Sequence, residues 1–125
     1  MSDQDPIAVA VARAHVEAWN HHDYDVVRTT LAPDVHVVVT SVDPGAPNVD
    51  TRDIEAYLEL GQGVVPGSLR VTSAIGDDTR ALLQVTTRVR FGPEAPEMTA
   101  HSARLYLLDE SHKIAEERVI FFVTQ

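Results

Sequence analysis

The sequence predicts an α+β fold in which three N-terminal helices pack on a mostly antiparallel β-sheet. Two observations lead to this prediction. Apolar residues recur at helical spacing in the first half of the chain, whereas β-branched and alternating segments separated by short turns fill the second half. The chain has 125 residues, of which 44% are hydrophobic, and this is enough for one domain with its own core. We therefore expect a single domain over residues 1–125.

The first helix is expected over about residues 6–20. Asp5 is a suitable N-cap, and Pro6 suits the first helical position. One stripe of this helix combines apolar residues with a histidine and should face the core: Ala8, Val11, Ala12, His15 and Trp19.

The second helix is expected over about residues 23–32. Asp23 is its expected N-cap. The helix should end before Pro33, because proline disfavours helical geometry in the residue that precedes it.

The third helix is expected over about residues 51–61. Asp50 or Thr51 is its expected N-cap, and Gly61 and Gly63 should end it.

Five strands are expected, over about residues 34–41, 69–75, 79–91, 98–109 and 113–124. The segment VDPGAPNVD, residues 42–50, is rich in turn-forming residues and should form a loop. Short turns separate the last strands, so these should pair as antiparallel neighbours.

The last hairpin decides which side chains share a face of the sheet. If Glu110 and Ser111 form a two-residue loop, Arg104 lies directly opposite Glu117. Four more residues would share the face of Arg104 and Glu117: Ser102, Tyr106, Val119 and Phe121. The opposite face would be the more apolar one: His101, Leu105, Leu107, Ile114, Ile120 and Phe122. Apolar content alone favours this second face as the buried one.

Composition and charge bear on the partners of the chain. The formal net charge of −9 argues against nucleic acid and anionic membrane surfaces. There is no cysteine, which excludes disulfides and cysteine nucleophiles. The N-terminal segment MSDQDP lacks the apolar run of a signal peptide, and no apolar run of roughly 18 residues could span a membrane. We therefore expect a cytoplasmic protein.

The segment AWNHHDYDVVRTTLAPDV, residues 18–35, resembles the nuclear transport factor 2-like superfamily, in particular its SnoaL-like branch. An aromatic–Asn pair, a short turn with aspartate and a helix that closes on APDV carry the resemblance. The segments DTRDIEAYLELG (50–61) and DESHKIAEERV (109–119) extend it over nearly the whole chain. The resemblance implies a cone-shaped fold: a strongly curved sheet around the helices, with an apolar pocket at the wide end. It favours the face of Arg104 and Glu117 as the concave one, so the two criteria leave this choice open.

The superfamily includes ketosteroid isomerase, scytalone dehydratase, limonene epoxide hydrolase, polyketide cyclases and non-catalytic proteins, so the fold does not determine the function. By the resemblance, Val39 stands where the isomerase has its general base and Arg104 where it has a second pocket acid. Phe122 falls near the aspartate that SnoaL-like cyclases use. These departures mean that the known isomerase and cyclase mechanisms do not carry over.

Three residues are the catalytic candidates. The resemblance places His15 where ketosteroid isomerase has a pocket tyrosine, and an imidazole there could donate to a carbonyl or act as a base. The alternative is a core histidine that is bonded to a neighbouring group. Arg104 would bind a carboxylate or enolate oxygen while Glu117 orients it. The alternative is a cross-strand surface salt bridge.

A ligand-binding lining is expected from five further residues: Trp19, Val39, Tyr57, Tyr106 and Phe121. The alternative for the aromatic residues is an ordinary place in the core. The six histidines show neither HxH nor HExxH spacing, and glycine-rich phosphate and dinucleotide motifs are absent from the sequence. The sequence therefore predicts neither a metal nor a cofactor.

Two functions fit these observations. One is a cofactor-independent isomerase, cyclase or dehydratase that acts on a small apolar carbonyl compound by proton transfer, with His15 as acid or base and Arg104 as oxyanion partner. The other is a non-catalytic ligand-binding or partner module that has lost the aspartates of the family. A homodimer through the convex face of the sheet is expected in both cases, with an apolar centre formed by Leu105, Leu107, Ile120 and Phe122.

Overall fold

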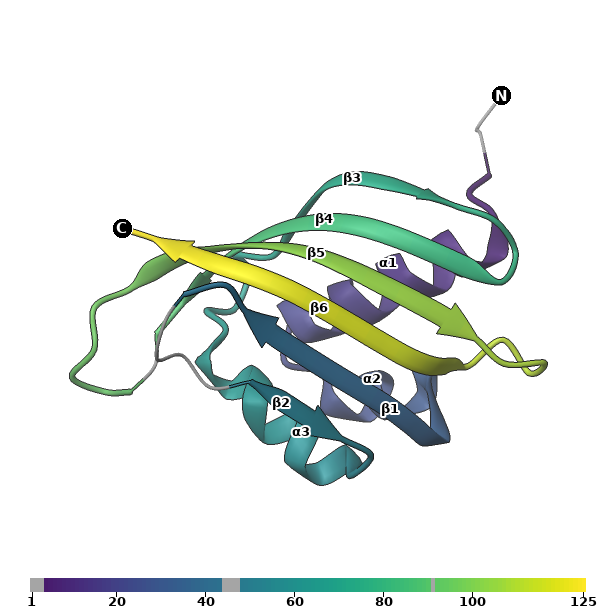
Figure 1. The fold of residues 1–125 in the computed structure, drawn as a ribbon, viewed down its shortest axis with the longest axis horizontal. Helices are drawn as coiled ribbons and strands as arrows, with labels where there is room; N and C mark the ends of the chain where they lie inside the picture. Colours follow the sequence, from purple (N-terminus) through teal and green to yellow (C-terminus); the bar gives the residue numbers. More distant parts are fainter. Residues whose placement is uncertain (1–3, 44–47, 91) are drawn as a thin grey trace.

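The computed structural model describes residues 4–43, 48–90 and 92–125. Its elements, in chain order, are α1 (Ile7–Asn20), α2 (Tyr24–Thr30), β1 (Leu31–Ser41), β2 (Val49–Thr51), α3 (Ile54–Leu60), the short 3-10 helix η1 (Gly61–Gly63), β3 (Arg70–Gly76), β4 (Arg80–Val89), β5 (Met98–Leu108) and β6 (Ile114–Thr124). Figure 1 shows these elements from the N-terminus in purple to the C-terminus in yellow.

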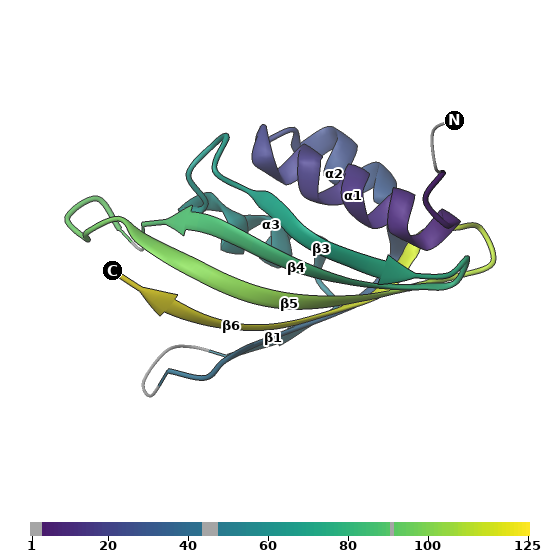
Figure 2. The same ribbon diagram turned by 90° about the horizontal axis from the view of Figure 1, so that it is seen from above.

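The strands form one six-stranded sheet in the order β2-β1-β6-β5-β4-β3. All neighbours are antiparallel except β1 and β6, which are parallel. Figure 2 shows that the sheet is curved and that the three helices lie on one side of it. The predicted α+β class, with three helices packed on a curved and mostly antiparallel sheet, is confirmed.

The start of α1 is held by a distant turn. The helix begins at Ile7, and its first two amides donate to Asp78 Oδ1 (3.2 Å) and to the carbonyl oxygen of Asp77 (3.1 Å) in the β3–β4 turn. The predicted capping by Asp5 is wrong, because its carboxylate pairs with Arg13 instead (3.0 Å). Amides left free at a helix start need acceptors, and here the tertiary fold supplies them.

Helix α2 begins as predicted and ends earlier. Asp23 caps it by accepting a hydrogen bond from the Val26 amide (3.3 Å). The helix ends at Thr30 rather than at residue 32, and β1 follows directly. Pro33 lies in the part of β1 where the register against β6 shifts. Such an irregular stretch tolerates a residue that cannot donate to the sheet.

The sequence analysis missed β2. Asp50 and Thr51 belong to this strand, so neither is the N-cap of α3 as predicted. Asp53 is the N-cap, and its Oδ1 accepts from two amides of the first turn (2.9 and 3.4 Å). A strand of three residues is too short to show a periodicity. Within the predicted loop 42–50, residues 44–47 lie outside the described residues.

The turn between β5 and β6 is longer than predicted. Its three residues are 110–112, since the Asp109 amide donates to the Lys113 carbonyl oxygen (2.8 Å) and His112 adopts a φ of 60°. This is the geometry of a three-residue hairpin loop with a left-handed last residue. A second irregularity shifts the register between Leu107 and Leu108.

The loop and the register shift together move β6 by two residues against the predicted pairing. Tyr106 therefore lies opposite Glu117, and Arg104 lies opposite Val119. The predicted direct pairing of Arg104 with Glu117 is wrong.

The face assignment nevertheless holds for most of the hairpin, because a shift by an even number of residues leaves each side chain on its side. Glu117 and Val119 are buried beneath the helices, whereas Ile120 and Phe122 are 56% and 45% exposed on the other face. The concave face is therefore the face of Arg104 and Glu117. Ile114 is the exception, because it precedes the irregularity and is buried in the core.

Candidate functional site

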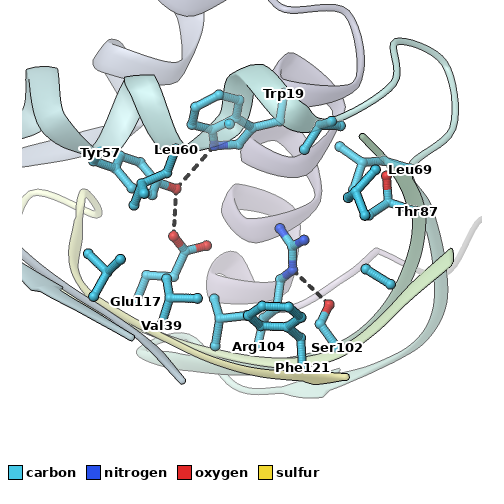
Figure 3. A pocket seen from close by; sticks show the side chains of 16 residues that line it. Trp19, Val39, Tyr57, Leu60, Leu69, Thr87, Ser102, Arg104, Glu117 and Phe121 are labelled. Atoms are coloured by element: carbon cyan, nitrogen blue, oxygen red, sulfur yellow. Dashed lines mark hydrogen bonds between the residues drawn. The ribbon is translucent and has the colours of Figure 1, made fainter. Parts of the chain in front are cut away.

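A cavity of about 190 Å³ lies between the concave face of the sheet and helices α1 and α3. Its wall is mostly apolar and comes from both layers of the fold: Trp19, Val39, Val49, Tyr57, Leu60, Gly61, Val64, Leu69, Thr87, Val89, Ala100, Ser102, Arg104, Glu117, Val119 and Phe121. Figure 3 shows Arg104 and Glu117 rising from the sheet toward Trp19 and Tyr57 on the helices. The cavity is thus an apolar hollow that contains one acidic and one basic side chain.

Glu117 is the acidic group of the cavity and is 1% exposed. Its Oε1 accepts a hydrogen bond from the Tyr57 hydroxyl at 2.5 Å. Its Oε2 lies 3.6 Å from His15 Nε2 and has no hydrogen-bond partner among the described residues. A buried carboxylate oxygen without a hydrogen-bond partner is costly, which marks Glu117 as a candidate functional residue.

The Tyr57 hydroxyl is the centre of a buried hydrogen-bond network. It donates to Glu117, accepts from Trp19 Nε1 at 3.0 Å, and lies 2.8 Å from His15 Nε2. Helix α3 places this hydroxyl over the sheet, because Asp53 fixes its N-terminus and Gly61 ends it against Trp19. A Cβ on Gly61 would lie 2.0 Å from Trp19 Cζ3, so only glycine lets the two elements pack this closely.

His15 is fully buried, but it does not line the cavity. Its ring lies behind Tyr57 and Glu117, with Nδ1 2.8 Å from Thr30 Oγ1 and Nε2 2.8 Å from the Tyr57 hydroxyl. The structure thus places His15 within reach of the acidic group and out of direct contact with a molecule in the cavity. Its predicted direct contact with a substrate carbonyl is not compatible with this geometry.

Burial by itself would raise the pKa of Glu117. The close approach and charge of His15, followed by the charge of Arg104, outweigh it and lower the pKa of Glu117 to about 2. Burial and the neighbouring Glu117 charge raise the pKa of the Tyr57 and Tyr106 hydroxyls well above their ordinary value. The network therefore contains an ionised carboxylate beside neutral tyrosines.

Arg104 is half-buried, and its Nε donates to Ser102 Oγ at 3.0 Å. Figure 3 shows the outer end of the guanidinium pointing into the cavity. Among the residues that the structure describes, the ion pairs within 4.0 Å of Glu117 involve His15 alone, so the predicted Arg104–Glu117 ion pair does not form. Burial would lower the pKa of Arg104, but the surrounding tyrosines and Glu117 raise it, and the side chain stays a cation.

The structure brings together most of the residues that the sequence analysis proposed. Six of the proposed residues line the cavity: Trp19, Val39, Tyr57, Arg104, Glu117 and Phe121. His15 and Tyr106 lie behind the wall, both less than 1% exposed. The Tyr106 hydroxyl makes no hydrogen bond of good geometry among the described residues.

Three polar contributors were not predicted as site residues. Thr30 holds His15 in place, Ser102 accepts a hydrogen bond from Arg104 in the cavity wall, and Thr87 adds a buried hydroxyl to the same wall. The signal for Thr87 was its place between Val85 and Val89 in an alternating strand. Nothing in the local sequence connects Thr30 to His15, since they lie on different helices.

Other features of the described residues bear on function. None of the helices in this part of the chain is both long and apolar enough to cross a membrane. In the same residues, no group of three or more His, Asp or Glu side chains is arranged to hold a metal ion.

Comparison with known proteins gives a family and several related folds. The model of the SnoaL-like domain matches residues 12–117. None of the curated proteins matches the chain. A crystal structure of a protein from Kribbella flavida DSM 17836 is 27% identical, with a TM-score of 0.66, and the match covers 90% of this chain and 84% of that chain.

Two solved structures of lower identity share the fold. An LEH-like epoxide hydrolase from M. tuberculosis is 21% identical over 92% of this chain and 82% of that chain, with a TM-score of 0.68. The Δ5-3-ketosteroid isomerase from Mycobacterium sp. is 17% identical over 95% of this chain and 99% of that chain, with a TM-score of 0.71. At these identities the likeness concerns the fold alone.

Proposed function

Since the chain belongs to the SnoaL-like domain family, we propose that it is a cofactor-independent enzyme that moves a proton on a small apolar carbonyl compound. Glu117 is the general base in this proposal, and Arg104 holds the carbonyl oxygen. The single observation that carries the proposal is Glu117 itself, a residue of the cavity wall whose buried Oε2 has no hydrogen-bond partner among the described residues.

The position of Glu117 suits a general base. Its carboxylate is ionised, Oε1 is anchored by Tyr57, and Oε2 makes no hydrogen bond within the described part of the chain, so this oxygen is the one that takes the proton from the substrate. The pKa of about 2 makes the resting carboxylate a weak base. When the guanidinium of Arg104 becomes engaged with an oxygen that gains negative charge, Glu117 loses part of the attraction that keeps its pKa low. Its affinity for a proton then rises during the reaction.

Arg104 supplies the complementary charge. Removal of a proton next to a carbonyl group leaves an enolate, whose oxygen carries the negative charge. A fixed cation in a cavity with few competing waters stabilises this charge more than it would in solution. Glu117 then returns the proton to another carbon, which completes an isomerisation. In a ring closure, the enolate carbon attacks a second carbonyl carbon, and Glu117 returns the proton to the alkoxide oxygen that forms there.

The size of the cavity limits the substrate. Pockets for drug-sized ligands enclose roughly 300–1,000 Å³, whereas an apolar cavity of about 150 Å³ holds benzene. The volume of about 190 Å³ found here suits a molecule of one or two rings. Structural neighbours include an epoxide hydrolase, a ketosteroid isomerase and SnoaL-like polyketide cyclases, so the same fold accommodates several reactions.

Proton abstraction can be tested without knowledge of the natural substrate. One- and two-ring ketones are incubated with the protein in ²H₂O, and the exchange of hydrogens next to the carbonyl is followed by NMR, with a one-ring epoxide as comparison. Glu117→Gln should lower the exchange rate by about 10²–10⁴-fold. Glu116→Gln is the matched control, because the neighbouring side chain pairs with Arg118 and does not line the cavity.

The outcomes separate the two functional classes. Exchange that is equally fast with Glu117→Gln would overturn the role of Glu117. Ketone binding by both proteins without any exchange would instead indicate a binding module, which is the alternative function of the same cavity. Hydrolysis of the epoxide without ketone exchange would replace the carbonyl substrate by an epoxide.

We also propose that the protein is a cytoplasmic homodimer. The absence of cysteine and the acidic composition support the location. The exposed Ile120 and Phe122 on the outer face of β6 support the dimer. Leu105 and Leu107 share this face on β5, where they lie opposite Arg118 and Glu116.

A further inference from the structure

A continuous chain of four side chains connects helix α2 to the cavity. Thr30 Oγ1 lies 2.8 Å from His15 Nδ1, His15 Nε2 lies 2.8 Å from the Tyr57 hydroxyl, and this hydroxyl lies 2.5 Å from Glu117 Oε1. His15, Tyr57 and Glu117 are buried, whereas Thr30 is half-buried at the outer end. This chain of hydrogen-bonded side chains thus runs from near the surface to the carboxylate of Glu117, a residue of the cavity wall.

At the outer end of this hydrogen-bond chain, Thr30 fixes the position of one hydrogen on the His15 ring. The Thr30 hydroxyl donates to the Val27 carbonyl oxygen at 2.7 Å, so its only hydrogen is already used. Thr30 Oγ1 must therefore accept from His15, and His15 Nδ1 carries a hydrogen.

The inner end allows two proton arrangements. The Tyr57 oxygen accepts from Trp19, has one hydrogen to give, and faces both His15 and Glu117. In the first arrangement His15 Nε2 donates to Tyr57, and Tyr57 donates to the Glu117 carboxylate. In the second arrangement a protonated Glu117 donates to Tyr57, and Tyr57 donates to His15 Nε2. Both satisfy every hydrogen bond, and both contain the same number of protons.

The distances favour the first arrangement at rest. Hydrogen bonds from a hydroxyl to a carboxylate are typically about 2.5–2.7 Å long, shorter than those between neutral oxygens. The contact of 2.5 Å between Tyr57 and Glu117 fits an ionised acceptor. If the group of His15, Tyr57 and Glu117 lost one proton, two lone pairs would face each other at either the His15–Tyr57 or the Tyr57–Glu117 contact. These three residues therefore keep their protons together.

We propose that Thr30, His15, Tyr57 and Glu117 form a proton relay that converts Glu117 from a base into an acid. The inference rests on the proposed function of Glu117. The proton on His15 Nε2 moves to the Tyr57 oxygen while the Tyr57 proton moves to Glu117 Oε1. His15 becomes neutral, Tyr57 stays protonated and Glu117 becomes a carboxylic acid at the cavity. His15 and Tyr57 are positioning residues in this scheme, since they act through Glu117.

The groups around Glu117 support the sharing of one proton between His15 and Glu117. The charged and titratable groups that face it are His15 from α1, Tyr57 from α3, and Arg104 and Tyr106 from β5. Of these groups, His15 has a ring that can give up a proton to the chain. Arg104 stays charged throughout and attracts the carboxylate form.

The relay can be tested on the free protein by the protonation of Glu117. Infrared difference spectra against Glu117→Gln isolate the carboxyl band. The wild-type protein should show an ionised Glu117 at neutral pH. In Tyr57→Phe, which breaks the chain but keeps the ring, and in His15→Gln, which keeps a donor but cannot release a proton, the midpoint of the Glu117 titration should rise by about 1–3 pH units.

Two further measurements separate a relay from a structural role. ¹⁵N NMR of labelled histidine, with His15 assigned from the His15→Gln spectrum, should show hydrogens on both ring nitrogens of the wild type. Trp19→Phe is the matched control, since it removes a hydrogen bond to the same Tyr57 oxygen without breaking the chain. The titration of Glu117 in this control should stay within about half a unit of the wild type, well inside the shift expected for a broken relay.

The spectroscopic result is independent of turnover. An unchanged Glu117 titration in both Tyr57→Phe and His15→Gln, or a neutral His15 in the wild type at neutral pH, would overturn the relay. A raised titration midpoint without ketone exchange would support the relay and remove the proposed function. Ketone exchange that is lost in Glu117→Gln, together with an unchanged Glu117 titration in Tyr57→Phe and His15→Gln, would support the proposed function and overturn the relay.

Discussion

Glu117→Gln should remove a pH-dependent part of the free energy of unfolding. The pKa of Glu117 is about 2 in the folded protein and 4.5 in its ordinary state. A carboxyl group whose pKa is lowered by folding stabilises the fold above its unfolded pKa. This stabilisation is lost as the pH falls through the folded pKa. The relevant window therefore lies between about pH 4.5 and pH 2.

The magnitude follows from the two pKa values. One pKa unit corresponds to about 1.4 kcal/mol, so the ionised Glu117 contributes about 3 kcal/mol at neutral pH and about 1 kcal/mol at pH 3. The stability difference between the wild type and Glu117→Gln should therefore shrink by about 2 kcal/mol between these conditions. Any effect of the glutamine on packing is a constant offset and does not enter this change.

Urea unfolding at pH 7 and pH 3, followed by the fluorescence of Trp19, measures this difference. Trp19 is the one tryptophan of the sequence and packs beside the network. Asp77 and Glu97, whose pKa values are also lowered, titrate in both proteins and cancel in the comparison. A stability difference that is the same at both pH values would refute the assignment of an ionised, stabilised Glu117.

Three further predictions test the packing and the assembly. Gly61→Ala should cost about 1–3 kcal/mol and change the Trp19 emission, because the added Cβ would lie 2.0 Å from the ring; an unchanged melting curve would contradict this contact. Asp53→Ala should lower the free energy of unfolding by about 1 kcal/mol, whereas Asp5→Ala should change it by less than about 0.5 kcal/mol, since Asp53 alone of the two is an N-cap. Sedimentation should show a dimer that Phe122→Glu converts to a monomer, and a wild-type monomer at micromolar concentration would refute the proposed interface.

Local patterns in the sequence predicted the three helices and five of the six strands. The stripe of α1 and the alternation of β4 mark the sides that are buried, because side chains repeat every 3.6 residues in a helix and every two residues in a strand. Asp23 and Gly61 mark helix ends for equally local reasons. The residue types on the concave face, including Arg104 and Glu117, were therefore grouped correctly from the sequence.

The partners of these side chains were decided by the tertiary structure. One extra residue in the hairpin loop and one register shift placed Tyr106, rather than Arg104, opposite Glu117. Neither the longer loop nor the register shift produces a periodic pattern in the sequence. The hydrogen bond of Glu117 comes instead from Tyr57, and its nearest charged neighbour is His15; these two residues belong to separate helices and meet only when both pack on the sheet.

The sequence by itself determined the fold class and which side chains share a face of the last hairpin, because these depend on periodicity and composition; which of the two faces is concave was decided by the tertiary structure. The tertiary structure decided that His15 lies behind the wall, that Glu117 Oε2 has no hydrogen-bond partner among the residues described, and that turn residues of the sheet cap α1. The physical reason is that a hydrogen bond requires positions accurate to a few tenths of an ångström. Such positions arise only from the packing of segments that are distant in the chain.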